Sequence, residues 1–172
     1  MSSSPLPVIL AGALAIVAVA SGCNSTTDGS FSSSNAGTAV RTAIAQPFTR
    51  ILGANTSGFT EAVEAVLRDQ AALQSAWRTL HDGVPGNPPP ALDLASTMVV
   101  VLALGPRNTA GYGIRADSVT SSAENLTVHY TVTSPGPGCM NAQMMTSPVD
   151  VISIARASGQ VRFIRETVIK QC

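Results

Sequence analysis

Three cysteines are the side chains of this 172-residue chain best able to form covalent bonds: Cys23, Cys139 and Cys172. We predict a disulfide between Cys139 and Cys172, because these two cysteines remain once Cys23 is set aside for the separate role described below. Two free thiols are the alternative. Neither His81 nor His129 lies in a motif that pairs with a nucleophilic cysteine, so cysteine catalysis is not expected.

Cys23 follows a short apolar segment, Val8–Ala20. A membrane-spanning helix needs about 20 apolar residues, whereas a secretory signal has an apolar stretch of this shorter length followed by small residues. The order Ala20-Ser21-Gly22-Cys23 resembles the lipobox of bacterial lipoproteins, although Ala20 replaces the usual Leu and residues 1–7 carry no Lys or Arg. The resemblance implies a signal peptide over 1–22 and a covalent lipid such as palmitate on Cys23, with simple signal cleavage as the alternative.

The segment after Cys23 is polar and rich in Ser, Thr, Asn and Gly from Asn24 to Thr38, so it cannot bury enough surface to fold alone. We expect a flexible tether over 23–45 and one domain over 46–172. An Asp after the lipidated cysteine would favour the inner membrane, and here Asn24 occupies that position. The expected location is therefore the bacterial cell envelope, lipid-anchored at the outer membrane.

Composition and motifs argue against several functions. Ten basic and ten acidic residues balance, so no strong field would attract nucleic acid. The sequence has no Gly-x-Ser-x-Gly elbow, no His-Glu-x-x-His pair and no phosphate loop. We expect no enzyme, no catalytic residue, no metal site and no cofactor besides the lipid. Met140, Met144 and Met145 could form a soft-metal cluster, but we interpret them as gap fillers.

One helix is expected near the start of the domain. Apolar residues from Gln70 follow helical spacing through Trp77 to Leu80, Asp69 is a good N-cap, and Gly83 supplies a stop. Trp77 is expected to anchor a core. Residues 62–68 alternate, which favours a strand before the helix, whereas a single long helix over 60–81 is the alternative.

The rest of the sequence predicts strands. Five β-branched or alternating runs are separated by Gly, Pro, Ser and Asn: Met98–Leu104, Tyr112–Val119, Leu126–Thr133, Val149–Ala155 and Val161–Ile169. One or two further strands are expected between Gln46 and Arg68. The predicted fold class is α+β, a mainly antiparallel β sheet or small sandwich with one inserted helix.

Three loops between these strands carry the most specific motifs. Residues 105–112 contain Gly111, which permits positive φ, residues 134–139 hold two Pro-Gly pairs, and Thr146-Ser147-Pro148 precedes a strand. Together with the helix ending in Trp and Leu, they resemble the PrcB family over roughly 68–156, although Ala110 stands where the family more often has Gly. The resemblance implies a non-catalytic accessory subunit of a surface protease complex. The residues that would bind a protein partner are Arg107, Asn108, Thr109, Gly111, Tyr112, Pro135, Gly136, Pro137, Gly138 and Pro148.

A second resemblance is to chagasin-type inhibitors of cysteine peptidases, which present three loops at one end of a β-sandwich. The loops 105–112, 134–139 and 146–149 are similar in order and kind. However, no proline separates Asn108 from Thr109, and Val149 replaces the aromatic residue that would enter the peptidase cleft. A peptidase inhibitor is therefore the alternative function.

Overall fold

The computed structural model describes residues 43–122 and 125–172, so the expected signal peptide, Cys23 and most of the expected tether lie outside the described residues. The elements, in chain order, are β1 (Ile44–Gln46), β2 (Phe48–Ala54), β3 (Val63–Leu67), α1 (Gln70–Leu80), β4 (Thr97–Ala103), β5 (Gly113–Ser122), β6 (Asn125–Pro135), β7 (Val149–Ala155) and β8 (Val161–Lys170). β1 begins two residues before the expected domain boundary at 46.

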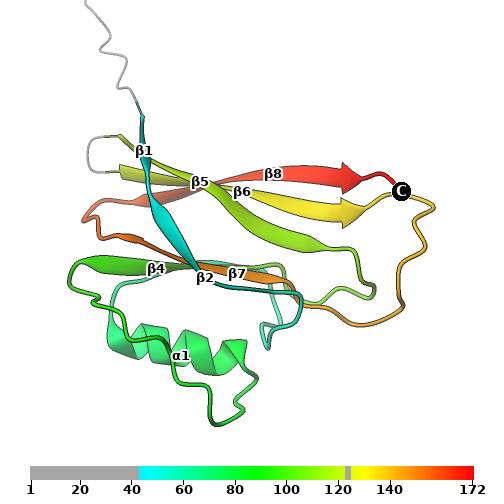
Figure 1. Cartoon of the computed structure of the whole chain (residues 1–172), viewed down its shortest axis with the longest axis horizontal. Coiled ribbons are helices and arrows are strands. Elements are labelled where there is room, and N and C mark those ends of the chain that lie inside the picture. Colours follow the sequence, from blue (N-terminus) through cyan, green and yellow to red (C-terminus); the bar gives the residue numbers. More distant parts are fainter. Residues whose placement is uncertain (1–42, 123–124) are drawn as a thin grey trace, which may run out of the picture. The chain divides into compact units, whose positions relative to one another are not determined.

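The strands form two stacked sheets. The first sheet has the order β1-β5-β6-β8, and the second sheet has the order β2-β7-β4-β3. Figure 1 shows them as two layers, with α1 as a third layer on the outer side of the second sheet. The chain passes from the first sheet to the second at Pro47, which has no backbone N–H to continue a ladder. The predicted α+β sandwich with one helix is confirmed.

Strand β4 is buried on both faces, which explains its unbroken apolar sequence. Val100 and Leu102 face the first sheet and join the core between the two sheets, whereas Val99 and Val101 face the helix and join a second core. Leu73, which is 1% exposed, and Leu80 extend that second core from α1. A strand covered on one face alone would have alternated apolar with polar residues.

Helix α1 begins and ends as its sequence predicts. The Asp69 carboxylate accepts a hydrogen bond of 2.8 Å from the backbone N–H of Ala72. After Leu80 the backbone turns left-handed at Asp82 (φ 54°) and Gly83 (φ 72°), and the Gly83 N–H bonds the carbonyl of Arg78. Trp77 is half-buried and packs against the core between α1 and the second sheet, as expected.

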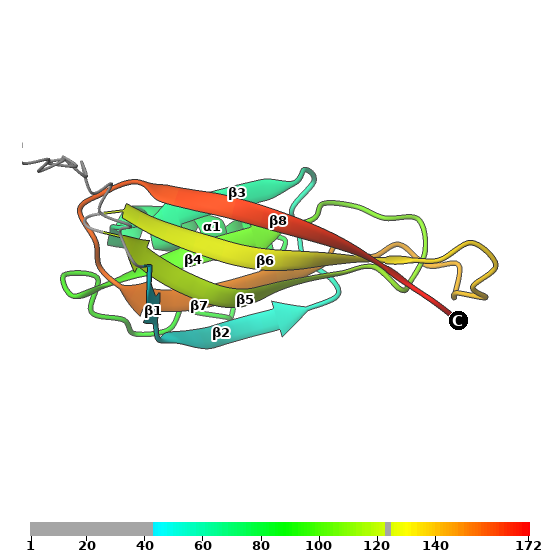
Figure 2. The same cartoon turned by 90° about the horizontal axis from the view of Figure 1, so that it is seen from above.

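The structure differs from the prediction in two respects. Two strands, β2 and β3, lie between Gln46 and Arg68 as expected, but β1 was not predicted; it continues into β2 as one extended segment divided between the two sheets. In addition, β8 runs parallel to β6. The chain leaves the first sheet after β6, crosses the second sheet as β7 and returns, so β8 has the direction of β6 (Figure 2).

An ion pair between a buried carboxylate and a partly exposed guanidinium joins the sheets along the side formed by β2 and β5. The Asp150 side chain is 2% exposed and accepts hydrogen bonds from Arg50 Nε (2.7 Å), Arg50 Nη2 (3.1 Å) and the Ala116 N–H (2.7 Å). Arg50 Nη2 also donates to the Ala116 carbonyl at 2.9 Å. The bond with Asp150 raises the pKa of the Arg50 guanidinium. Both strands change register here, β2 between Arg50 and Leu52 and β5 between Ala116 and Ser118.

The opposite side of the sandwich, between β3 and β8, has its own polar contact. The Tyr130 hydroxyl donates a hydrogen bond to the Glu64 carboxylate of β3. Both side chains line a hollow that Arg165 of β8 also lines. Burial, and secondarily the bond with Glu64, raises the pKa of Tyr130 to about 12. The two sheets are therefore joined by polar contacts on both sides of an apolar core.

Substituting Arg50 tests the first contact. We expect Arg50→Met to lower the free energy of unfolding by roughly 3 kcal/mol, because the Asp150 carboxylate would stay buried without its cation. Urea unfolding measures the loss, and Arg115→Met, at an exposed position of β5, is the matched control. A change below about 0.5 kcal/mol for Arg50→Met would contradict the assigned importance of the pair.

Alkaline titration tests the second contact. Because the folded-state pKa of Tyr130 is raised, its contribution to stability is complete below pH 10 and is lost as the pH rises toward 12. The loss should reach roughly 2 kcal/mol. Unfolding of the wild type and of Tyr130→Phe is compared between pH 9.5 and 12. Identical pH profiles for the two would disprove the assignment.

Candidate functional site

Three strand connections and the C-terminus lie at one end of the domain. The connections are 55–62 between β2 and β3, 104–112 between β4 and β5, and 136–148 between β6 and β7. We call this end the loop tip; in Figure 1 it is the end marked by the C-terminus. It contains all three of the loops that the sequence singled out.

The β4–β5 and β6–β7 loops are hydrogen-bonded to each other. Arg107 and Thr146 exchange two backbone hydrogen bonds of 2.7 and 2.9 Å, forming an isolated bridge. The Ala110 N–H donates to the carbonyl of Ala142 at 3.0 Å, and the Thr146 hydroxyl donates to the carbonyl of Thr109 at 3.1 Å. Loops that are 37 residues apart in sequence therefore act as one unit.

Gly111 is required where these two loops meet. Its φ is +94°, as expected, and a Cβ added there would lie 2.6 Å from Asn141 Oδ1 and 3.3 Å from Pro135 Cβ. A side chain at this position would be strained by the positive φ and would also displace the Asn141 side chain.

Tyr112 lies between the core and the surface. Its half-buried ring packs against the core between the sheets, and the Arg107 guanidinium lies 5.7 Å from the ring centroid. Beside it is an open hollow of about 380 Å³. Its lining is mixed and includes Asn55, Thr56, Tyr112, Thr133, Met144 and Lys170. The hollow is broad and shallow, which suits contact with a protein surface better than enclosure of a small ligand.

Part of the predicted binding set is buried. Pro148 is buried, and so are the two residues before it, Thr146 and Ser147, which lie outside the set and are each 6% exposed. Hydrogen bonds of Ser147 hold this segment against the β2–β3 connection. Its N–H donates to the backbone carbonyl of Asn55, and its hydroxyl donates to the backbone carbonyl of Phe59. Residues 146–149 therefore position the tip and present no surface of their own, so the third loop of a chagasin-type arrangement is not displayed.

The remaining residues of the set differ in exposure. Asn108, Gly111, Pro137 and Gly138 are exposed, Arg107, Thr109, Tyr112 and Pro135 are half-buried, and Gly136 is buried. The Gly136 N–H donates to the carbonyl of Lys170 at 3.0 Å, and a Cβ added to Gly136 would lie 2.8 Å from the same oxygen. Gly136 thus allows the end of β8 to pass close to the β6–β7 loop.

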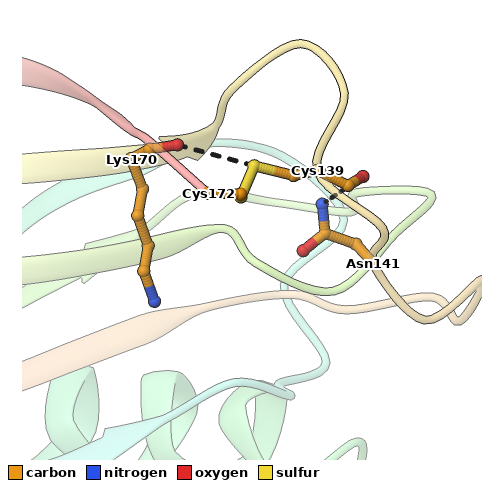
Figure 3. The surroundings of a disulfide bond; sticks show 4 residues. All are labelled: Cys139, Asn141, Lys170 and Cys172. Atoms are coloured by element: carbon orange, nitrogen blue, oxygen red, sulfur yellow. Dashed lines mark hydrogen bonds between the residues drawn. A yellow bond between two sulfur atoms is a disulfide. The ribbon is translucent and has the colours of Figure 1, made fainter.

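The predicted disulfide is present. Cys139 and Cys172 are bonded, with their Cα atoms 5.5 Å apart (Figure 3). Asn141 Nδ2 donates to the carbonyl of Cys139 at 3.2 Å, and the Sγ of Cys139 lies 3.6 Å from the carbonyl oxygen of Lys170. The β6–β7 loop is therefore fixed at one end to the C-terminus and at the other to Arg107 and, through Ser147, to Asn55 and Phe59.

Three methionines occupy the loop between these two attachments, and the sequence interpretation of them as gap fillers is wrong. Met140, Met144 and Met145 are 102%, 53% and 64% exposed. Flexible, polarizable methionine side chains are common on adaptable protein-binding surfaces. Their spacing alone could not show this exposure, because it results from the disulfide and the Arg107–Thr146 bridge that hold the loop outward.

The tip carries few groups for acid–base chemistry. His81 caps the C-terminal end of α1 beside Trp77, and His129 lies on the polar face of β6, as expected. Within residues 43–122 and 125–172, no three His, Cys, Asp or Glu side chains gather to hold a metal ion. No helix in these ranges is long and apolar enough to cross a membrane.

Residues 98–155 match the family described as PrcB C-terminal, so this part of the chain is similar to that family. The matched segment covers about a third of the chain, from β4 to the end of β7, and includes both loops joined at Gly111. The family name associates this domain with subunits of protease complexes. No curated protein and no solved structure is significantly similar to the chain.

Removing the disulfide tests its role in the tip. In a Cys23→Ser background, which leaves only the bonded pair, Cys139→Ser with Cys172→Ser should lower the free energy of unfolding by about 3 kcal/mol. The reason is that the bond closes a loop whose ends are 33 positions apart. Denaturant unfolding with and without reductant measures it, and an unfolding midpoint that reductant leaves unchanged would contradict the prediction.

Proposed function

We propose that this protein is a non-catalytic accessory subunit, lipid-anchored at the cell envelope, that uses the loop tip to bind and stabilise a peptidase. The observation that carries the proposal is the loop tip itself: two hydrogen-bonded loops within the PrcB match display apolar side chains on a rigid base. Fold alone does not define function, and this surface is the feature that supports a binding role.

The chemistry of the tip supports protein binding. Exposed Met140 and Met145 offer apolar contact area, and Arg107 with Tyr112 offers an aromatic and cationic pair next to them. Aromatic residues, Met and Arg are the types enriched at the centres of protein interfaces. Because the disulfide and the paired loops restrict the tip before it meets a partner, binding would cost little ordering entropy.

The same surface favours an accessory role over inhibition. A wedge inhibitor needs an apolar anchor on its third loop, and the corresponding residues 146–149 are buried here. The available contacts are broad and adaptable, which suits a subunit that holds a partner without blocking its cleft.

Capture of the anchored protein from its own cells tests the proposal. The tagged chain is cross-linked, purified and analysed by mass spectrometry, and the eluate is assayed for peptidase activity. We expect an active peptidase, and Met140→Ser with Met145→Ser should reduce its recovery about tenfold through loss of exposed anchors. These side chains are preferable to Tyr112, which also covers the core.

The matched control is Ile44→Ser, because Ile44 and Met145 are each 64% exposed and Ile44 lies at the other end of the domain. Equal loss of the peptidase with Ile44→Ser would show that removing any exposed apolar side chain lowers recovery, which would contradict binding through the tip. Capture of a papain-like peptidase in an inactive form would support the inhibitor, and recovery without any peptidase would overturn the proposal.

Anchoring is tested separately, by feeding cells an alkyne analogue of palmitate. Cys23→Ser should abolish labelling and release the protein from the membrane fraction, because Cys23 is the expected acceptor. Membrane retention of unlabelled Cys23→Ser would contradict the lipid anchor.

A further inference from the structure

Among the residues that the structure describes, strand β8 forms a long open edge of the first sheet. It spans Val161–Lys170, and its assigned strand partner is β6. The backbone carbonyls of Gln160 and Lys170 accept from Leu126 and Gly136, so the even-numbered residues of β8 direct their backbone groups toward β6. The odd-numbered residues, Val161 to Ile169, therefore direct theirs to the outside of the sheet.

This edge is also apolar on its solvent-facing side. Ile164 and Val168 are 52% and 41% exposed, and they lie opposite His129 and Thr133 on the face of β6 that points away from the core. β1, at the other edge of the sheet, is only three residues long. Open edges of this length with apolar side chains readily pair with another strand.

We propose that β8 pairs antiparallel with β8 of a second copy of this chain, joining the two first sheets into one continuous sheet across a two-fold axis. Such an interface is self-complementary, since each residue contacts the symmetry-related position of its partner. The charges on β8 identify the occupant, because they complement those of the same strand reversed.

The charges also define the register. With the two-fold axis at Ile164, residues 161–167 of each strand are paired, and Arg162 lies directly opposite Glu166 of the second copy on the solvent-facing side. Two such ion pairs flank the contact between the two Ile164 side chains. On the inner face, Phe163 lies opposite Arg165 of the second copy.

Neighbouring registers are less favourable. An axis at Arg165 places two guanidinium groups opposite each other, and an axis at Glu166 does the same with two carboxylates. An axis at Val168 pairs Glu166 with Lys170, but it pairs only residues 166–170 of the strand. The register centred on Ile164 pairs more residues than the one centred on Val168 and also places opposite charges against each other.

Sedimentation equilibrium of the purified chain with Cys23→Ser tests the dimer without any peptidase or membrane. The wild-type sequence should show a concentration-dependent monomer–dimer equilibrium. Arg162→Glu and Glu166→Arg should each weaken it at least about tenfold by placing like charges opposite each other twice. The double swap Arg162→Glu with Glu166→Arg should restore it.

These residues are exposed, so the variants should unfold at the wild-type temperature, which circular dichroism checks. A wild-type chain that stays monomeric at roughly millimolar concentration would overturn the proposal, as would single variants that dimerise normally. Restoration by Glu166→Lys with Lys170→Glu, and not by the first swap, would overturn the register. Dimerisation of the purified chain is measured independently of peptidase capture, so this inference and the proposed function can fail separately.

Discussion

The carboxylate of Asp150 is the group on which the arrangement of the two sheets most depends. A charge 2% exposed between the sheets is tolerated only where nearly every acceptor position is used, and Arg50 with the Ala116 N–H fills three of them. Those donors come from β2 and β5, in different sheets, and each strand changes register close to the contact. The ion pair thus fixes the position of β2 against β5 more sharply than the apolar core could, because apolar contacts are not directional.

The double burial of β4 accounts for the remaining architecture. A strand that is apolar on both faces needs two partners, which here are the first sheet on one side and α1 on the other. The connecting loops lie at the ends of these layers. Ser147 joins the β6–β7 loop to the β2–β3 connection through hydrogen bonds to Asn55 and Phe59. These bonds hold the tip in place against the sheets.

Local patterns in the sequence predict most of the elements. β7 occupies the predicted residues 149–155, and α1 begins after its predicted cap Asp69, since periodicity and capping act within a few residues. The predicted disulfide also forms. What the sequence could not reveal depends on distant partners: Asp150 resembles an ordinary strand residue until Arg50, 100 positions away, is placed beside it. Likewise, the exposure of Met140 depends on how the disulfide holds its loop.

The position of β1 has a consequence for orientation. Ile44 pairs with Ser121 near the end of β5, whereas Gly113 begins β5 beside the tip. The ten residues of β5 span roughly 30 Å, so the chain joins the domain about that far from the tip. The residues that enter the domain through β1 and the residues that form the tip therefore lie at opposite ends of the first sheet, so a change at one end has no direct contact with the other.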